Sequence, residues 1–546
     1  MSNEVHWLDR YFTQIIVEDD GSEEPPRGRL NLIGFEVVDN AAAGRTEVRA
    51  GTELQHTPVS SATPADGQVL GLVDGVWTPA DPSTLVPPVP DVTNVAFPGG
   101  SGYASASAAF ASEDLGTIRI RFVLLTPPTP GAFHWLAGFT LAGAQGWTLC
   151  TTDSLGGAPV AQARAYVALD GVLTAVARKF WVPETTGQLV TMHIAKDPGT
   201  TKVHVYCFGH EIGESGSSPA GRGVAYTTYN KPSSTALGVG NDSTQSFASE
   251  QGIVEVVTSS IAMSAAQVLA DAKLPVGAPM AGQTHAYRAS SLPASTWPDG
   301  NASVSLSRTG TVAVTTNKLQ VVQTSRTWRL FGDSILAGYM VSAAYGNGYR
   351  KRVQQLLAAR GMPINAVGWS YSAAGTFDYD IWHNGTGGER MQTRVATFAS
   401  DLANCGAVGS GLHLAYGIND LADAVPPNRT WTQLRADLVS ACDLHQADSP
   451  GAPIVLESPF MPGAPYPLLG PQVTQINNAI AGFDALIVEL NAKGYIVEPV
   501  RRYDIITDPS LGAGLTWDGL HLTPLGNETL APFVADAYER AMRRSA

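Results

Sequence analysis

Residues 327–336 have the sequence TWRLFGDSIL, and this stretch decides the fold of the C-terminal part of the chain. An apolar, strand-like run ends in a Gly-Asp turn that exposes Ser334. A serine hydroxyl is a weak nucleophile until a base takes its proton, so hydrolytic chemistry needs a histidine and an orienting carboxylate elsewhere in the chain. Asp518 and His521 lie close together near the C-terminus and supply these two residue types.

Three blocks of this region resemble the SGNH (GDSL-type) hydrolases, a family of serine esterases and acylhydrolases. The blocks are GDS, GIND and DGLH, in that order along the chain. The resemblance implies that Ser334 is the nucleophile, His521 the general base and Asp518 its partner. It also implies an oxyanion hole that includes the backbone N–H of Ser334 and the side chain of Asn419.

A further block of the family, a glycine block, is matched least well. The candidate is the SAAGT sequence that contains Gly375, which the resemblance makes a backbone oxyanion donor, and Gly368 is the competing glycine. Asp333 and Asp420 are expected to brace their turns through hydrogen bonds rather than to react. His413 lies in the middle of an apolar run and is expected to be a core histidine.

Residues 326–546 alternate strand-like and helix-like segments, which predicts an α/β three-layer domain with a parallel sheet and helices on both faces. In such sheets, sites form at the carboxyl ends of the strands, where Ser334, Gly375 and Asn419 are expected. The expected strands cover 327–330, 364–367, 412–416, 454–457 and 495–500, and the expected helices include 393–402, 430–445, 473–492 and a terminal helix from 524.

The composition limits the possible partners. A chain of 546 residues is too long for one core and indicates several domains. Its formal charge of −14 argues against nucleic acid and against an anionic membrane surface as partners. The four cysteines lack CxxC or metal-like spacing, so a disulfide framework is not expected. No acidic cluster in the β-rich region has calcium-loop spacing, so no metal is expected there, and no cofactor is expected. The start of the chain lacks the pattern of a secretion signal, and no apolar run is long enough to predict a membrane span.

The region from 95 to 275 has an all-β pattern. Residues 118–122 and 203–208 alternate with period two, and Asp170-Gly171 is a hairpin signal. Ser264 begins a capping box that predicts one short helix. This arrangement resembles laminin-G or concanavalin-like jelly-roll sandwiches, which implies either a glycan-binding domain or a spacer.

The N-terminal region carries a second resemblance. Residues 29–48 alternate into a turn and resemble a short β element of phage tail-fibre and tail-spike proteins. The predicted organisation is an N-terminal β-rich attachment region (1–50), a Pro/Ser/Thr-rich connector (51–94), the β-sandwich (95–275), a β connector (276–325) and the hydrolase domain (326–546).

Two classes of function follow. The first is a virion tail esterase that removes O-acetyl or other short acyl groups from a bacterial surface polysaccharide. Its N-terminus would bind other tail proteins, and the fibre resemblance implies a homotrimer. The second is an adhesin that binds glycan on a non-catalytic SGNH scaffold. A lipase or thioesterase is the alternative within the enzyme class. Neither nucleic-acid binding nor membrane insertion is expected.

Overall fold

The computed structural model divides the chain into two units, residues 1–88 and 89–546. In the first unit the structure describes 35–40, 45–50, 53–54, 57–58, 69–73 and 76–80. In the second it describes 91–96, 102–105, 114–125, 133–139, 145–152, 162–180, 187–212, 223–232, 237–240, 249, 251–291, 296–300, 305–309, 313–318, 326–338, 348–368, 370–371, 382–405, 407–422, 429–463, 466–507 and 514–545.

The described residues of the first unit form antiparallel two-stranded sheets. β1 (Phe35–Asn40) pairs with β2 (Arg45–Ala50), so the alternating sequence around this turn forms a hairpin. The region expected to be an extended connector contains further pairs, namely β3 (Glu53–Leu54) with β4 (Thr57–Pro58) and β5 (Val69–Val73) with β6 (Val76–Ala80).

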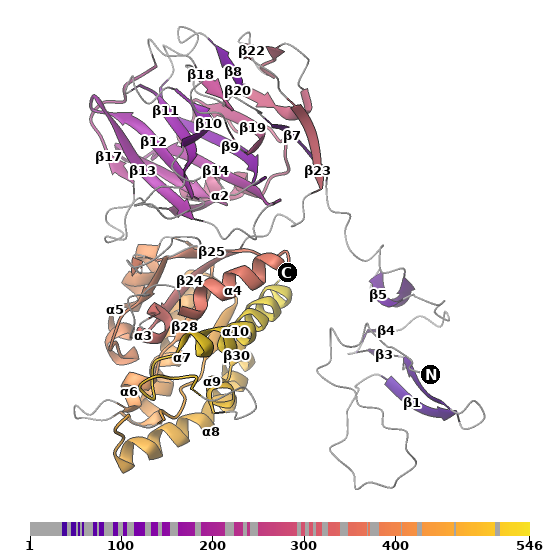
Figure 1. The fold of residues 1–546 in the computed structure, drawn as a ribbon, viewed down its shortest axis with the longest axis vertical. Helices are drawn as coiled ribbons and strands as arrows, with labels where there is room; N and C mark the ends of the chain where they lie inside the picture. The colour runs from indigo at the N-terminus through magenta and orange to yellow at the C-terminus, as the bar shows by residue number, and fades with distance from the viewer. Residues whose placement is uncertain are drawn as a thin grey trace. The chain divides into compact units, whose positions relative to one another are not determined.

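The second unit begins with two antiparallel sheets (Figure 1). The first has the order β13 (Val172–Phe180), β12 (Gln162–Leu169), β11 (Trp147–Thr152), β10 (Phe133–Gly138), β18 (Leu237–Val239), β8 (Gly102–Ser105), β22 (Leu306–Thr309) and β21 (Thr296–Trp297). The second has the order β16 (His210–Ile212), β15 (Lys202–Cys207), β14 (Leu189–Lys196), β9 (Thr117–Val123), β19 (Gly252–Ser259), β7 (Asp91–Ala96) and β23 (Ala313–Lys318), with β17 (Val224–Ala225) beside β15 and β20 (Gln283–Arg288) beside β19.

One hydrophobic cluster joins these two sheets. It contains Leu149 and Val167 from the first sheet and Ile120 and Val205 from the second. Burial of apolar surface between two antiparallel sheets is the basis of a β-sandwich. The more specific laminin-G or concanavalin-like jelly roll stays a prediction.

Two local predictions for this β domain are confirmed. Asp170 and Gly171 have φ angles of 50° and 83° between β12 and β13, as expected for a two-residue hairpin turn. Ser264 caps α2 (Ala265–Ala272), and its hydroxyl accepts a hydrogen bond from the N–H of Gln267.

The separate connector predicted at 276–325 is wrong, because its strands belong to the sheets of the β domain. β22 pairs with β8, and β23 pairs with β7 over the full register from Ala313–Ala96 to Lys318–Asp91. β20 pairs with β19, and a 3-10 turn, η6 (Ala289–Ser291), follows it. Alternation identified these strands, but it carries no information about partners some 200 residues earlier in the chain.

The C-terminal part of the second unit contains the predicted parallel sheet. Its order is β26 (Ser370–Tyr371), β27 (Trp382–Gly385), β24 (Arg326–Gly332), β28 (Gly411–Ala415), β29 (Ile454–Glu457) and β30 (Val497–Val500), with β25 (Ile364–Val367) also pairing with β24. The described pairs of this sheet are parallel except for β26 with β27.

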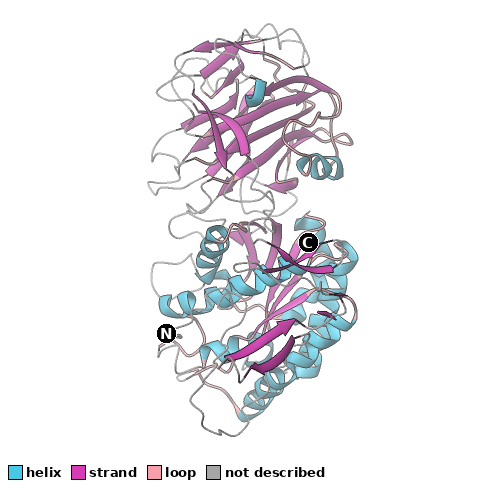
Figure 2. Cartoon of the chain, turned by 90° about the vertical axis from the view of Figure 1, so that its right-hand side faces the viewer, coloured by secondary structure: helices cyan, strands magenta, loops and turns pink. Residues whose placement is uncertain are grey.

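Helices flank this sheet on both sides (Figures 1 and 2). α4 packs against α10, whereas α5 and α8 each pack against α7. Thr430 and Thr523 cap α7 and α10, close to the predicted starts of these helices. The predicted strands 364–367 and 454–457 have the observed bounds, and the ends of the other predicted elements differ by a few residues. The helices are α3 (Ser334–Ala337), α4 (Gly348–Ala359), α5 (Met391–Cys405), α6 (Ile418–Ala422), α7 (Trp431–Asp448), α8 (Gly470–Ala492), α9 (Arg502–Ile506) and α10 (Pro524–Arg544).

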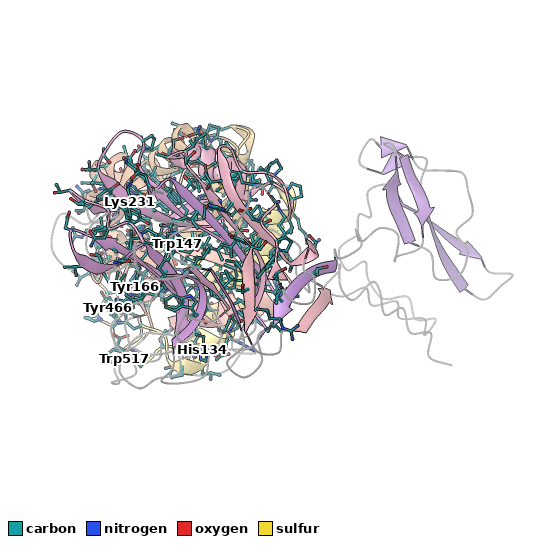
Figure 3. All side chains as sticks on the ribbon, turned by 90° about the horizontal axis from the view of Figure 1, so that it is seen from above. His134, Trp147, Tyr166, Lys231, Tyr466 and Trp517 are labelled. Atoms are coloured by element: carbon teal, nitrogen blue, oxygen red, sulfur yellow. The ribbon has the colours of Figure 1, made fainter. Side chains whose placement is uncertain are left out.

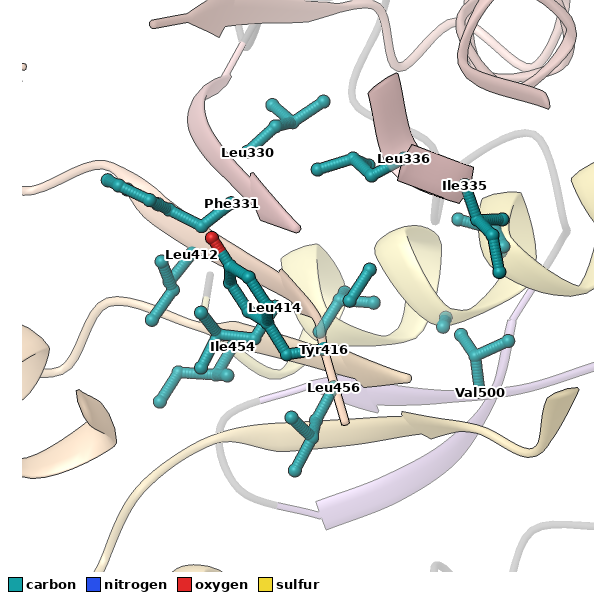
Figure 4. Packing of buried hydrophobic residues seen from close by; sticks show 14 of the residues in the cluster. Leu330, Phe331, Ile335, Leu336, Leu412, Leu414, Tyr416, Ile454, Leu456 and Val500 are labelled. Atoms are coloured by element: carbon teal, nitrogen blue, oxygen red, sulfur yellow. The ribbon is translucent and has the colours of Figure 1, made fainter. Parts of the chain in front are cut away.

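The apolar side chains of β24 and β28 anchor the centre of the sheet (Figure 4). Leu330, Phe331, Leu412 and Leu414 are almost completely buried in one cluster. Each such side chain contributes about 1.5–3 kcal/mol relative to an exposed one. The carboxyl end of β24, where the GDS block begins, is therefore held on a rigid element.

Candidate active site

Ser334 directly follows the carboxyl end of the central strand. Gly332, the last residue of β24, pairs with Ala415 of β28, and the N–H of Asp333 donates to the Ala415 carbonyl at 3.2 Å. A Cβ on Gly332 would lie 2.6 Å from the Cβ of Leu336, so the turn into α3 requires glycine at this position. The first residue of α3 is Ser334, which is almost completely buried.

Asp333 braces this turn, as the sequence predicts. Its Oδ1 accepts a hydrogen bond of 2.9 Å from the N–H of Ile335, which caps α3. The side chain is completely buried, and this burial raises the pKa of the carboxyl to about 6 against the opposing effect of nearby Arg502. Asp333 is thus a buried carboxyl group on the residue that directly precedes Ser334 in the sequence.

The DGLH block forms a tight loop. Thr516 and Leu522 form an isolated antiparallel bridge, and the N–H of Trp517 donates to the carbonyl of His521 at 3.0 Å. Gly519 has a φ of +84°, and a Cβ there would lie 1.9 Å from a neighbouring carbonyl oxygen. The glycine therefore lets the loop close and bring its acid and its histidine together.

The acid of this loop is both hydrogen-bonded and ionised. Oδ1 of Asp518 accepts from the N–H groups of Leu520 at 2.9 Å and His521 at 2.7 Å. Burial alone would raise the pKa of Asp518, but the His521 side chain and these two N–H groups lower it below its ordinary value. Asp518 is therefore a carboxylate at neutral pH.

The structure brings the three predicted residues into one hydrogen-bonded chain. Oδ2 of Asp518 lies 2.7 Å from Nδ1 of His521, and Nε2 of His521 lies 2.9 Å from Oγ of Ser334. Because Asp518 is ionised, Nδ1 carries the ring proton and Nε2 is left to accept from the serine hydroxyl. Residues 187 positions apart in sequence thus meet with the geometry of a nucleophile and its base.

The predicted oxyanion donors are only partly described. Asn419 lies in α6 just after β28, at the same sheet edge as Ser334, and its Nδ2 donates one hydrogen bond of 3.0 Å to the Glu389 carbonyl. An amide nitrogen carries two hydrogens, and among the described residues the Glu389 carbonyl accepts one of them. Gly375 lies outside the described residues. Gly368 packs against β27, where a Cβ would lie 2.3 Å from the carbonyl oxygen of His383.

Asp420 of the GIND block has a bracing role that reaches beyond its own turn. Its carboxylate accepts from the N–H groups of Met391 at 2.8 Å and Gln392 at 3.2 Å, at the start of α5. It also contacts the guanidinium of Arg429 at 3.3 Å. These bonds fix α6, which carries Asn419, to the neighbouring helix.

A buried network in this domain was missed by the sequence analysis. Glu457, at the end of β29, is completely buried and accepts from the hydroxyl of Tyr349 at 2.7 Å. Its oxygens lie 2.7 Å from Nε2 of His413 and 3.2 Å from Nε of Arg502. His413 is thus a satisfied core histidine, as predicted, and Nδ1 of its ring lies 2.8 Å from the hydroxyl of Tyr538. The one sign of this network in the sequence is the glutamate that ends the apolar run 454–457.

The fold and the site define the class of this domain. A parallel sheet flanked by helices carries a serine at its central carboxyl edge, hydrogen-bonded to a histidine and an aspartate. Residues 330–529 match the model of the GDSL-like Lipase/Acylhydrolase family. These residues therefore form a domain of the GDSL/SGNH acylhydrolase type.

Solved structures with likeness to this chain include several esterases. A family 3 carbohydrate esterase of Clostridium thermocellum is 20% identical over 41% of this chain and 100% of its own, with a TM-score of 0.33. A lipase/acylhydrolase of Enterococcus faecalis is 20% identical over 40% and 96%, with a TM-score of 0.30. An acetylxylan esterase of Geobacillus stearothermophilus is 18% identical over 39% and 94%, with a TM-score of 0.31. No curated protein matches the sequence.

Within the part of the chain that the structure describes, no group of three or more His, Cys, Asp or Glu side chains is arranged to hold a metal ion. None of the helices in that same part combines the length and apolar character needed to cross a bilayer.

Proposed function

We propose that this protein is a serine esterase that removes O-acetyl or other short acyl groups from a bacterial surface polysaccharide. The observation that carries the proposal is the continuous chain of hydrogen bonds from Asp518 through His521 to Ser334. A hydroxyl 2.9 Å from an imidazole nitrogen with the correct tautomer is poised to lose its proton during attack on an ester carbonyl.

In the proposed mechanism each residue has one role. His521 takes the Ser334 proton as Oγ bonds to the ester carbonyl carbon, and Asp518 stabilises the resulting imidazolium. His521 then gives the proton to the leaving sugar oxygen, and the acyl-enzyme forms. Water, deprotonated by His521, releases the carboxylic acid and restores Ser334.

The tetrahedral intermediate carries a negative oxygen that needs donors. The backbone N–H of Ser334, the side-chain amide of Asn419 and the backbone N–H of Gly375 are the proposed donors. Removal of one donor of this kind typically costs about 2.7–4 kcal/mol of transition-state stabilisation.

A virion tail location is part of the proposal. It is supported by the hairpin β1–β2, whose sequence resembles an element of phage tail-fibre and tail-spike proteins. In this arrangement the N-terminal region binds other tail proteins, three chains associate, and the β domain presents the esterase to the cell-surface polysaccharide.

The test compares the wild-type chain with Ser334→Ala on 4-nitrophenyl acetate, butyrate and octanoate. The wild type is expected to cleave acetate fastest, and the variant to lose activity by about 10⁴–10⁶-fold because the nucleophile is gone. Ser400→Ala, on the exposed side of α5, is the matched control and should keep the wild-type rate. Equal rates for Ser334→Ala and wild type would remove Ser334 from the mechanism and favour the adhesin.

A further inference from the structure

Trp517 is an exposed aromatic residue directly beside the reactive histidine. It is 43% exposed, and it is the one tryptophan among the exposed large hydrophobic residues in the described part of the chain. Its ring centroid lies 6.0 Å from that of His521, and the two ring planes are 22° apart. By contrast, Trp328 of the same domain is completely buried.

The backbone of Trp517 is fixed relative to the reacting groups. The N–H of Trp517 donates to the carbonyl of His521, and the flanking Thr516–Leu522 bridge closes the loop. Tyr466 lies on the segment packed against Gly519 of this loop, and Figure 3 labels it near Trp517. Anything bound on the indole therefore lies close to the Ser334–His521 hydrogen bond.

We propose that Trp517 is the platform on which the sugar ring that carries the scissile ester stacks. The inference rests on the proposed esterase function and specifies the ligand of its leaving-group side, a pyranose face. The carbonyl carbon of an O-acyl sugar is two bonds from the ring, so the ring of a bound substrate must lie next to Ser334 and His521. The C–H groups of a pyranose face match a flat aromatic surface, and its hydroxyl rim stays in water.

The position of the platform explains how a partly exposed site selects sugars. The side chains of His521 and Asp518 keep 14% and 24% of their surface accessible, so this side of the triad faces solvent. Without a contact surface, any small acetate ester would be bound equally well. An indole beside the imidazole adds binding for esters whose alcohol part is a ring.

The test distinguishes stacking of the sugar ring on Trp517 from a role in which Trp517 only supports the side chain of His521. Wild type, Trp517→Ala and Trp517→Phe are assayed by proton release with glucose pentaacetate and with glycerol triacetate, which has no ring. For Trp517→Ala, the ratio of kcat/KM for the sugar to kcat/KM for glycerol triacetate should fall roughly tenfold, mainly through KM, and Trp517→Phe should restore most of it. Phe533→Ala removes an aromatic of similar exposure (41%) in the third turn of α10 and should leave both substrates unaffected.

A binding measurement completes the test without turnover. Calorimetry with glucose pentaacetate on Ser334→Ala and on Ser334→Ala/Trp517→Ala should show a Kd about tenfold weaker in the double variant. An unchanged Kd, or equal losses on both esters in the assay, would overturn the platform. If Ser334→Ala still cleaves glycerol triacetate, the esterase mechanism fails instead, and calorimetry still decides the role of Trp517.

Discussion

The β domain and the acylhydrolase domain both contain hydrogen-bonded His–Asp pairs, and the β-domain pair of His193 and Asp271 differs in its surroundings from the pair of His521 and Asp518. His193 of β14 lies 2.8 Å from Asp271 of α2, a contact as close as that of His521 with Asp518. The His193–Asp271 pair is almost completely buried, and among the described residues Nδ1 of His193 has no hydrogen-bond partner. In the hydrolase domain the second ring nitrogen meets Ser334, and the pair reaches solvent.

The charges around the β-domain pair explain its structural character. Arg119 makes two hydrogen bonds to Asp271, at 2.8 and 2.9 Å, and contacts Glu255 at 2.9 Å. Burial, together with Arg119 and Arg121, lowers the pKa of His193, so its ring is neutral at neutral pH. A His–carboxylate pair therefore indicates catalysis only when its other nitrogen reaches a nucleophile and the site is open to a substrate.

The largest contrast is expected from the same substitution in both histidines. His521→Gln should lower kcat/KM for 4-nitrophenyl acetate by about 10⁴-fold or more, because Ser334 loses its base. His193→Gln should leave kcat/KM of the folded protein unchanged and lower the melting temperature, since a buried group is disturbed. Steady-state kinetics and thermal melts of both variants check this. A comparable loss of activity in His193→Gln would mean that the β domain contributes to the reaction.

The two aspartates offer the next contrast. Asp518→Asn should reduce kcat by roughly 10⁴-fold, because an amide no longer fixes the Nδ1–H tautomer of His521, and it should leave stability nearly unchanged. Asp271→Asn should keep kcat but cost about 3–5 kcal/mol of unfolding free energy, because Arg119 loses a buried counter-charge. Urea unfolding and kcat measurements on both proteins decide the matter, and a stable Asp271→Asn would contradict the structural role of the β-domain pair.

Asp333 is expected to show the smallest effect and a distinct pH dependence. Its folded pKa of about 6 lies above the ordinary value of 3.8, so its contribution to stability is present below pH 4 and is lost as pH rises through 6. A difference of roughly two units corresponds to about 3 kcal/mol. Asp333→Asn keeps the cap on Ile335 and cannot ionise, so it should gain stability relative to wild type between pH 4 and 7.

Urea unfolding at pH 4, 5, 6 and 7 measures this difference. A gap between Asp333→Asn and wild type that stays constant across the series would show that the carboxyl of Asp333 does not titrate in this range. Asp518, whose pKa is lowered, should show no such gain on substitution.

The sequence singled out Ser334, Asp518 and His521, which the structure joins by hydrogen bonds, because the patterns that contain them are local. Asp518 and His521 share one loop, and Ser334 follows a short apolar strand, so block order and residue type were sufficient. The α/β alternation and the caps at Thr430 and Thr523 were visible for the same reason, since each depends on a few consecutive residues.

What the sequence did not show depends on distant partners. The partners of Glu457 come from β28, α4 and α9. The sequence of β29, IVLE, does not indicate that its glutamate contacts Arg502. The strands β22 and β23 were recognised, but their partners lie in the first strands of the β domain. The exposure of Trp517 likewise depends on how its loop folds over the sheet.

The pairing of β7 with β23 determines how the β domain bears mechanical load. These are the first and the last of its described strands, and their pairing runs from Asp91 opposite Lys318 to Ala96 opposite Ala313. The chain therefore enters and leaves the domain at the same end of one antiparallel pair. A force pulling on both connections would open this pair from Asp91–Lys318 one bonded step at a time, like a zipper, instead of shearing all of its hydrogen bonds together.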